Sequence, residues 1–161
     1  MNEPTIKIIL VPVDFSEITM SVVENAVYFA RLLSARLLLL HVVHVPPFAE
    51  ASTWLDPVVS PSVEHDITSQ MKRTAEANLK KLAEECGNEE GSAEALVREG
   101  VPFNEILKCA EERGVDMIIL GSHGRTGISY LLMGSVASRV VHRARCSVLC
   151  IKSKGEAASS Q

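Results

Sequence analysis

Apolar residues along the chain follow two kinds of pattern, short continuous runs and longer stretches with helical spacing. Continuous runs rich in Leu, Ile and Val cover residues 6–13, 36–45, 116–120 and 147–152. Runs of this length without polar alternation are typical of strands that are buried on both faces of a sheet. A shorter strand is predicted near residues 92–98. The pattern therefore predicts a mostly parallel sheet that is covered on both sides.

Between these runs, apolar residues recur every three or four positions, which is the spacing of amphipathic helices. This spacing predicts helices over residues 16–34, 63–86, 102–114 and 137–144. Ser16 is a candidate N-cap for the first of them. Pro102 suits the first turn of the third helix, and Gly114 suits its end.

The alternation of strands and helices predicts β-α-β units and therefore a doubly wound, Rossmann-like α/β fold with helices on both faces. A length of 161 residues suits one domain with a sizeable core. We expect this domain to cover residues 5–152 and the small polar residues 153–161 to form a disordered tail. The segment at residues 46–62 is longer than an ordinary connection. It could be a lid, an interface segment or a disordered loop.

Composition and charge exclude several kinds of partner. The formal net charge is −4, and no run of Lys or Arg exceeds two residues, so nothing favours binding to nucleic acid or an anionic membrane. The apolar run over residues 8–13 is too short to span a bilayer, and we expect a cytoplasmic protein. The four cysteines form neither a Cys-x-x-Cys pair nor a zinc pattern, so they are interpreted as mainly buried apolar residues.

The strongest chemical signal is a glycine-rich turn after the strand at 116–120, which includes Gly121, Gly124 and Gly134. Ligands of doubly wound sheets bind beyond the carboxyl ends of the strands, where the winding reverses. Glycines there permit positive φ and close backbone approach, and Ser135 marks a predicted helix start that favours anions. A mobile turn with Ser135 as a helix cap is the alternative. The P-loop and Gly-x-Gly-x-x-Gly motifs are absent, so a nucleotide would be held differently.

The spacing Gly121-x2-Gly124-x9-Gly134-Ser135 resembles that of the universal stress proteins that bind ATP. The resemblance extends to Val-Pro-Val-Asp-Phe-Ser at residues 11–16, Leu-His-Val at 40–42, Gly-Val-Pro at 100–102 and Ser-Val-Leu-Cys-Ile at 147–151. It covers about residues 5–152 and implies a five-stranded sheet of order 3-2-1-4-5, with the switch point between strands one and four.

The resemblance also implies bound ATP and Mg²⁺ and a set of residues that contact them. Pro12, Val13 and Val42 would border the adenine, and Asp14 would lie near the ribose and a phosphate-bound metal. The residues implied for the ribose and phosphates are Gly121, His123, Gly124, Arg125, Gly134, Ser135 and Val136. A carboxylate suits Mg²⁺, and backbone amides with a hydroxyl can hold phosphates without a lysine.

Several of these residues have simpler interpretations. Asp14 could only stabilise a turn, because Asp is frequent in turns. His123 could act as an acid or base or only form a hydrogen bond within the loop, and Arg125 could contact phosphate or be an exposed loop residue. His41 and His44 are three positions apart on a strand, so they point to opposite faces, cannot share a metal, and are interpreted as structural.

In the implied order the last strand lies at the edge of the sheet. Its apolar residues are Val148, Leu149, Cys150 and Ile151. An unpaired apolar edge favours association, so we expect a homodimer through this strand.

The leading functional hypothesis is an ATP-binding regulatory protein of a stress response, in which nucleotide occupancy changes conformation or partner binding. No catalytic residue is assigned. The alternatives are a slow ATPase or another nucleotide-dependent enzyme on the same scaffold, and an interaction module with a vestigial site.

Overall fold

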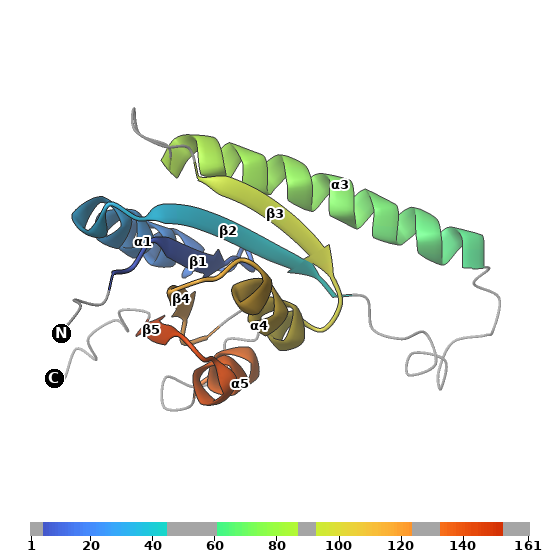
Figure 1. Ribbon diagram of the computed structural model, residues 1–161. Helices are drawn as coiled ribbons and strands as arrows, with labels where there is room; N and C mark the ends of the chain where they lie inside the picture. The colour runs from blue at the N-terminus through green and yellow to red at the C-terminus, as the bar shows by residue number, and fades with distance from the viewer. Residues whose placement is uncertain (1–4, 45–60, 87–92, 124–132, 153–161) are drawn as a thin grey trace, which may run out of the picture.

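The computed structural model describes residues 5–44, 61–86, 93–123 and 133–152, which form one sheet between two helical layers (Figure 1). The elements in chain order are β1 (Ile8–Pro12), α1 (Thr19–Leu33), β2 (Arg36–Val43), α3 (Pro61–Cys86), β3 (Glu94–Glu99), α4 (Pro102–Glu112), β4 (Met117–Gly121), α5 (Ser135–Arg143) and β5 (Ser147–Ile151). All strands are parallel, in the order β3-β2-β1-β4-β5. The predicted fold class and strand order are therefore confirmed.

Two predicted segments fall mostly outside the described residues. The tail at 153–161 lies outside them entirely, and so do all but the last two residues of the segment 46–62. Those two residues already belong to α3, which begins at Pro61 rather than at residue 63.

The central strands are buried on both faces, as their continuous apolar character predicts. Ile9 and Val11 of β1 pack into the core under α1 and α3, whereas Leu10 packs into the core under α4 and α5. All three side chains are fully buried. Successive side chains of a strand point to opposite faces, so a strand covered on both sides must be apolar at every position.

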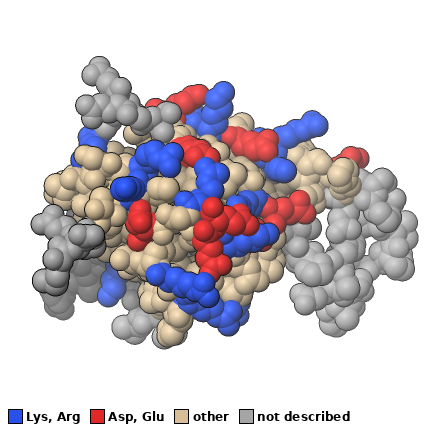
Figure 2. All heavy atoms as spheres, viewed as in Figure 1, with Lys and Arg blue, Asp and Glu red and all other residues tan. Residues whose placement is uncertain are grey.

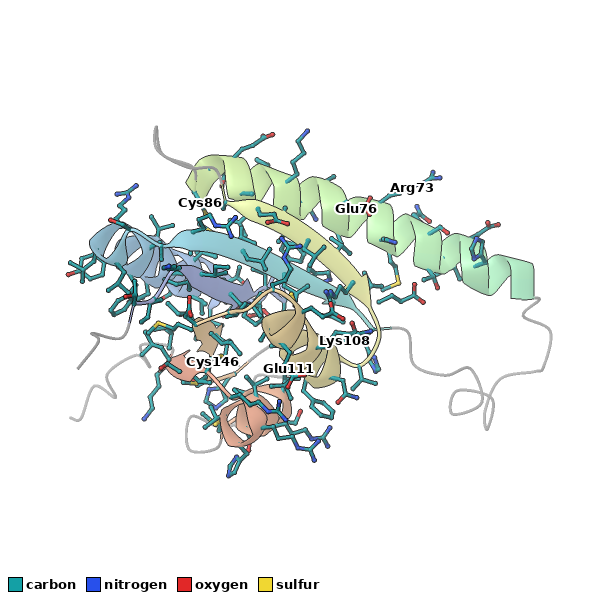
Figure 3. The ribbon with its side chains drawn as sticks, viewed as in Figure 1. Arg73, Glu76, Cys86, Lys108, Glu111 and Cys146 are labelled. Carbon is teal, nitrogen blue, oxygen red and sulfur yellow. The ribbon has the colours of Figure 1, made fainter. Side chains whose placement is uncertain are left out.

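Each helix buries one stripe of side chains against the sheet. Long helix α3 lies over β2 and β3, and its buried residues are Ala75, Leu79, Leu82 and Ala83. Arg73 and Glu76 of the same helix point away from the sheet into solvent (Figure 3). Helices α1 and α3 form the layer on one face of the sheet. The layer on the opposite face consists of α4 and α5, which pack against each other as well as on the sheet (Figure 1).

The boundaries of the helices confirm one sequence signal and correct another. Pro102 is the first residue of α4, and Gly114 follows that helix with a φ of +59°, as expected. Ser16 is not the N-cap of α1, because that helix begins at Thr19. The Ser16 hydroxyl instead donates to Oδ1 of Asp14 at 2.6 Å, so its capping capacity is used in the preceding turn.

Asp116 fixes the two central strands relative to each other. Its Oδ2 accepts hydrogen bonds from the amides of Lys7 and Ile8 at 2.8 and 3.0 Å, and its own amide donates to the Ile8 carbonyl at 3.0 Å. These bonds set the register of β1 against β4 at the amino ends of both strands. The carboxyl ends, where the site is predicted, are aligned as a consequence.

The two edges of the sheet differ in chemistry. Edge strand β3 carries Arg98, whose side chain is 18% exposed and lies 3.6 Å from Glu105 and 2.5 Å from Glu112 of α4. The hydrogen bond from Arg98 holds the pKa of Glu112 below its usual value. Edge strand β5 contributes half-buried apolar side chains and no charged residue. The two edges thus differ in charge, since β3 carries an ion pair to α4 and β5 does not.

Charge is mixed over the molecular face that carries β3, α3 and α4. Figure 2 shows Lys and Arg interspersed with Asp and Glu on this face, and pairs such as Lys108 with Glu112 and Arg145 with Glu111 account for part of the mixing. Within the described ranges, no helix is both long enough and apolar enough to cross a bilayer.

The four cysteines are free thiols in the described structure. Cys109 is buried, and Cys86, Cys146 and Cys150 are half-buried. Burial raises the pKa of all four thiols, which keeps them protonated at neutral pH. They therefore pack as apolar residues, as the sequence suggested.

Candidate functional site

A cavity of about 250 Å³ opens at the carboxyl ends of β1, β2 and β4, between α1 on one side and α4 and α5 on the other. This position is the switch point of the sheet, because β1 continues into α1 on one face and β4 leads to α5 on the opposite face. The lining residues are Pro12, Val13, Asp14, Ile18, Thr19, Val22, Leu40, His41, Val42, Pro102, Ile106, Leu120, Gly121, Ser122, His123, Gly134, Ser135, Val136 and Ala137.

Most residues implied by the sequence meet at this cavity although they come from distant parts of the chain. Those that line it are Pro12, Val13, Asp14, Val42, Gly121, His123, Gly134, Ser135 and Val136. Gly124 and Arg125 lie outside the described residues. Ligand binding by the whole set stays a prediction, but its described members share one cavity.

The turn after β1 is organised by the carboxylate of Asp14. Oδ1 accepts hydrogen bonds from the Ser16 amide at 3.0 Å, the Ser16 hydroxyl at 2.6 Å and the Thr19 hydroxyl at 3.2 Å. The turn-stabilising role considered for Asp14 is therefore present. These bonds use one carboxylate oxygen, and the other has no partner among the described residues, so the turn role leaves an oxygen available to a ligand.

The same turn holds Phe15 in the left-handed region, with a φ of +57°. This backbone conformation is uncommon for a bulky residue and requires support from its surroundings. The Phe15 ring lies 4.8 Å from the His41 ring, between centroids, at an interplanar angle of 41°. Nδ1 of His41 in turn donates to the Val13 carbonyl at 2.7 Å. The turn thereby packs a histidine ring against the end of β1.

The first and last residues of the glycine-rich segment after β4 are joined by a backbone hydrogen bond. The Gly134 amide donates to the Ser122 carbonyl at 2.7 Å, and the Ser122 amide donates to the Ile151 carbonyl at 2.8 Å. Ser122 is only 4% exposed, and its hydroxyl lies 2.9 Å from Nδ1 of His123. Nε2 of His123 is buried and lacks a hydrogen-bond partner in the described part of the chain. A buried polar atom of this kind requires a partner, which the described residues do not supply.

Helix α5 presents free amides to the cavity. Its first backbone bond runs from the Ser138 amide to the Gly134 carbonyl at 2.9 Å, so the amides of Ser135, Val136 and Ala137 have no partner within the helix. These three residues line the cavity. Gly134 is the N-cap and no side chain caps the helix, so the alternative in which Ser135 only caps α5 is wrong.

The described glycines of the motif, Gly121 and Gly134, do not adopt a positive φ. Gly134 has a φ of −57°, and the positive φ angles among described glycines belong to Gly100 and Gly114, outside the motif. Gly121 has a packing reason instead, because a Cβ there would lie 3.1 Å from the His123 carbonyl oxygen and 3.1 Å from Cγ2 of Ile18. Gly121 thus allows α1 to approach the end of β4 closely.

Some lining residues were not identified from the sequence. Ile18, Thr19 and Val22 enter the cavity because α1 packs across the end of β4, and Ile106 enters from α4. His41 was recognised but interpreted only as structural. Local patterns do not report such contacts, although the Gly-Val-Pro segment at 100–102 placed Pro102 at the start of a helix next to the site.

Among the described lining residues, Asp14 carries the one carboxylate, and there is neither Lys nor Arg. An anion in the cavity would therefore be held by amide dipoles and neutral polar groups.

A parallel sheet with helices on both faces and a cavity at its switch point defines a doubly wound α/β protein whose cavity lies where this class of fold binds ligands. The chain belongs to the universal stress protein family, which it matches over residues 5–152. It is 34% identical to Universal stress protein MJ0531 of Methanocaldococcus jannaschii, over 94% of this chain and 85% of the relative.

Solved structures agree with this assignment. The structure of protein MJ0577 of the same organism has a TM-score of 0.75 and 31% identity, covering 93% of this chain and 98% of that chain. A more distant family member from Arabidopsis thaliana, solved with AMP bound, has a TM-score of 0.55 and 18% identity, covering 92% and 93%. The second likeness is evidence for the fold alone.

We expect Gly121→Ala to lower the free energy of unfolding by about 1–3 kcal/mol, because the new methyl group overpacks the contact with Ile18. Urea denaturation of the single variants and of Gly121→Ala/Ile18→Ala measures the coupling. In the double variant, the loss should be smaller than the sum of the two single losses. Additive losses would show that the Ile18 contact is not the reason for glycine.

Proposed function

We propose that this protein binds ATP together with Mg²⁺ in the cavity at the switch point, and that nucleotide occupancy regulates its conformation or its partners in a cytoplasmic stress response. The observation that carries the proposal is that three features share one cavity: α5 amides and a buried histidine nitrogen that have no partner among the described residues, and the end of β2 that extends past β1.

The end of β2 extends past the end of β1, and its unpaired backbone groups suit the adenine base. Arg36 of β2 donates to Lys7 and Leu40 accepts from Val13, whereas Val43 accepts from Gly100 beyond β3. Backbone groups of a strand alternate in direction, so the amide and carbonyl of Val42 face the β1 side, past the end of β1. An adjacent donor and acceptor match the ring nitrogen and amino group on the Watson–Crick edge of adenine.

The α5 end suits the phosphates. Unpaired amides and the positive end of a helix dipole stabilise anions without a lysine. When the Ser122 hydroxyl donates to Nδ1 of His123, a lining residue, Nε2 carries the hydrogen and is a donor. A phosphate or ribose oxygen would satisfy this buried group.

A magnesium ion fits the site only as a partner of the nucleotide. Mg²⁺ commonly uses one or two carboxylates together with phosphate oxygens and water. No cluster of three or more His, Cys, Asp or Glu that could hold a metal occurs among the described residues. The second carboxylate oxygen of Asp14 would therefore hold a magnesium ion whose other ligands are phosphates and water.

Membership of the universal stress protein family supports a nucleotide as the ligand, because the family protein from Arabidopsis thaliana was solved with AMP bound. A binding role fits better than turnover, because the described lining offers one carboxylate and no cation for the transferring phosphoryl group. Free thiols throughout the described structure fit a reducing compartment. A slow ATPase remains the competing function.

Ser135→Ala should weaken ATP binding by about 0.5–1.5 kcal/mol, the usual net contribution of one hydrogen bond. Isothermal titration calorimetry with MgATP measures this loss, and Ser138→Ala is the matched control because Ser138 lies on the same helix outside the cavity lining. Absence of ATP binding by the wild-type protein would contradict the proposed function. Equal losses in both variants would show that the effect comes from the helix.

Purified protein should hydrolyse ATP far more slowly than about 1 s⁻¹, the lower end of ordinary enzyme rates. Release of phosphate under saturating MgATP measures the rate. Turnover at or above that rate, abolished by Asp14→Asn with binding retained, would favour the enzyme over the binding protein.

We also propose a homodimer through β5. Ser147 donates to Asp116 and Ile151 accepts from Ser122, so the backbone groups of these two residues face β4. Backbone groups alternate in direction along a strand, so the amides of Val148 and Cys150 point outward from the edge of the sheet. Leu149 donates inward, toward β4. The outward amides and the half-buried apolar side chains of this edge suit strand pairing with a second copy.

Val148→Pro should convert the dimer to a monomer, because proline removes an outward donor while leaving the inward ladder to β4 intact. Val148→Thr retains the amide and is the control. Light scattering at micromolar concentration gives the oligomeric state, with circular dichroism confirming the fold. A monomeric wild-type protein, or a dimeric folded Val148→Pro variant, would rule out this interface.

A further inference from the structure

The side chain of His41 lies at the boundary between the fold and the cavity. Its ring lines the cavity, and Nδ1 lies 2.7 Å from the Val13 carbonyl oxygen. A carbonyl oxygen only accepts, so Nδ1 carries the hydrogen and donates it. We propose that His41 is a positioning residue for the base: by occupying the Val13 carbonyl, it keeps the Val42 amide free for the ligand. This inference rests on the proposed binding of ATP.

The ladder between β1 and β2 shows what the histidine replaces. Arg36 donates to the Lys7 carbonyl at 2.8 Å, and the pairing then advances two residues at a time along both strands. One further step past Pro12 and Leu40 would direct the Val42 amide to the Val13 carbonyl. In the structure no backbone bond joins these two described residues, and the Val13 carbonyl accepts from His41 instead.

The end of the ladder is therefore set by a side chain. Val13 still pairs through its amide, which donates to the Leu40 carbonyl at 2.8 Å. Its carbonyl would be the natural acceptor for the next amide of β2. Without the imidazole, that oxygen would lose its partner and become available to Val42, and pairing would remove the donor on which base reading depends.

The position of the ring is determined by its neighbours. The Phe15 ring packs on His41, and the left-handed conformation of Phe15 is held by the hydrogen bonds of the Asp14 carboxylate to the following turn. The imidazole therefore has a fixed place at the end of β1 before any ligand binds. Pre-organisation of this kind lowers the ordering cost of binding.

His44 provides an internal comparison on the same segment. Its Nδ1 lies 3.1 Å from the Gly100 carbonyl, so it makes the same kind of imidazole-to-carbonyl bond. His44 is exposed and does not line the cavity. If the bond contributes only to folding stability, replacing either histidine should affect stability alone. An effect on binding of the base should appear only when His41 is replaced.

The test compares binding of MgATP with binding of the magnesium complex of 1-deaza-ATP, in which a C–H group replaces the ring nitrogen that would accept from Val42. The variants are His41→Phe, which retains a ring against Phe15 without a donor, and His41→Asn, which retains a donor at the position of Nδ1. His44→Phe is the matched control. Calorimetry gives both dissociation constants for each protein, and thermal melts report folding.

Wild-type protein should bind ATP about 3- to 10-fold more tightly than 1-deaza-ATP, the usual effect of one hydrogen bond. His41→Phe should bring this ratio close to one by weakening ATP alone, His41→Asn should recover most of it, and His44→Phe should leave it unchanged. A folded His41→Phe variant with the wild-type ratio would overturn the role of His41, as would a wild-type ratio of one. Wild-type protein that binds neither nucleotide would instead overturn the proposed function.

Discussion

The pairing of β1 with β4 is the interaction on which the rest of the molecule depends. It joins the two halves of a doubly wound sheet, and Asp116 sets its register through two amides of the β1 end. Because the chain leaves β1 toward one face and β4 toward the other, a crevice must open where these strands end. The cavity is thus a consequence of topology, and the loops around it determine what it can bind.

Backbone groups provide most of the chemistry of this cavity. Free amides of α5, an open end of β2 and one carboxylate face a space without a described lysine or arginine. A site made of fixed dipoles is well arranged for holding a nucleotide and poorly equipped for stabilising charge that develops during a reaction. The same arrangement is the reason why we propose binding rather than turnover.

The fold was predictable because its signals are local, whereas several site features are not. Continuous apolar strands and periodic helices follow from burial alone, so the elements and layers agreed with expectation, whereas the confirmed strand order had been implied by the family resemblance. The start of α1 was misplaced because Asp14 captures the Ser16 hydroxyl. The bond from His41 to Val13 joins positions 28 apart, and the role of Gly121 depends on Ile18 of a packed helix. Contacts of this kind exist only after the chain has folded.

The hydrogen bond between the Gly134 amide and the Ser122 carbonyl fastens the two ends of the glycine-rich segment directly to each other. Because the Ser122 amide also donates to the Ile151 carbonyl, Ser122 joins the end of β5 to the start of α5 as well. The part of α5 that lines the cavity is therefore anchored to the carboxyl ends of two strands by backbone bonds alone.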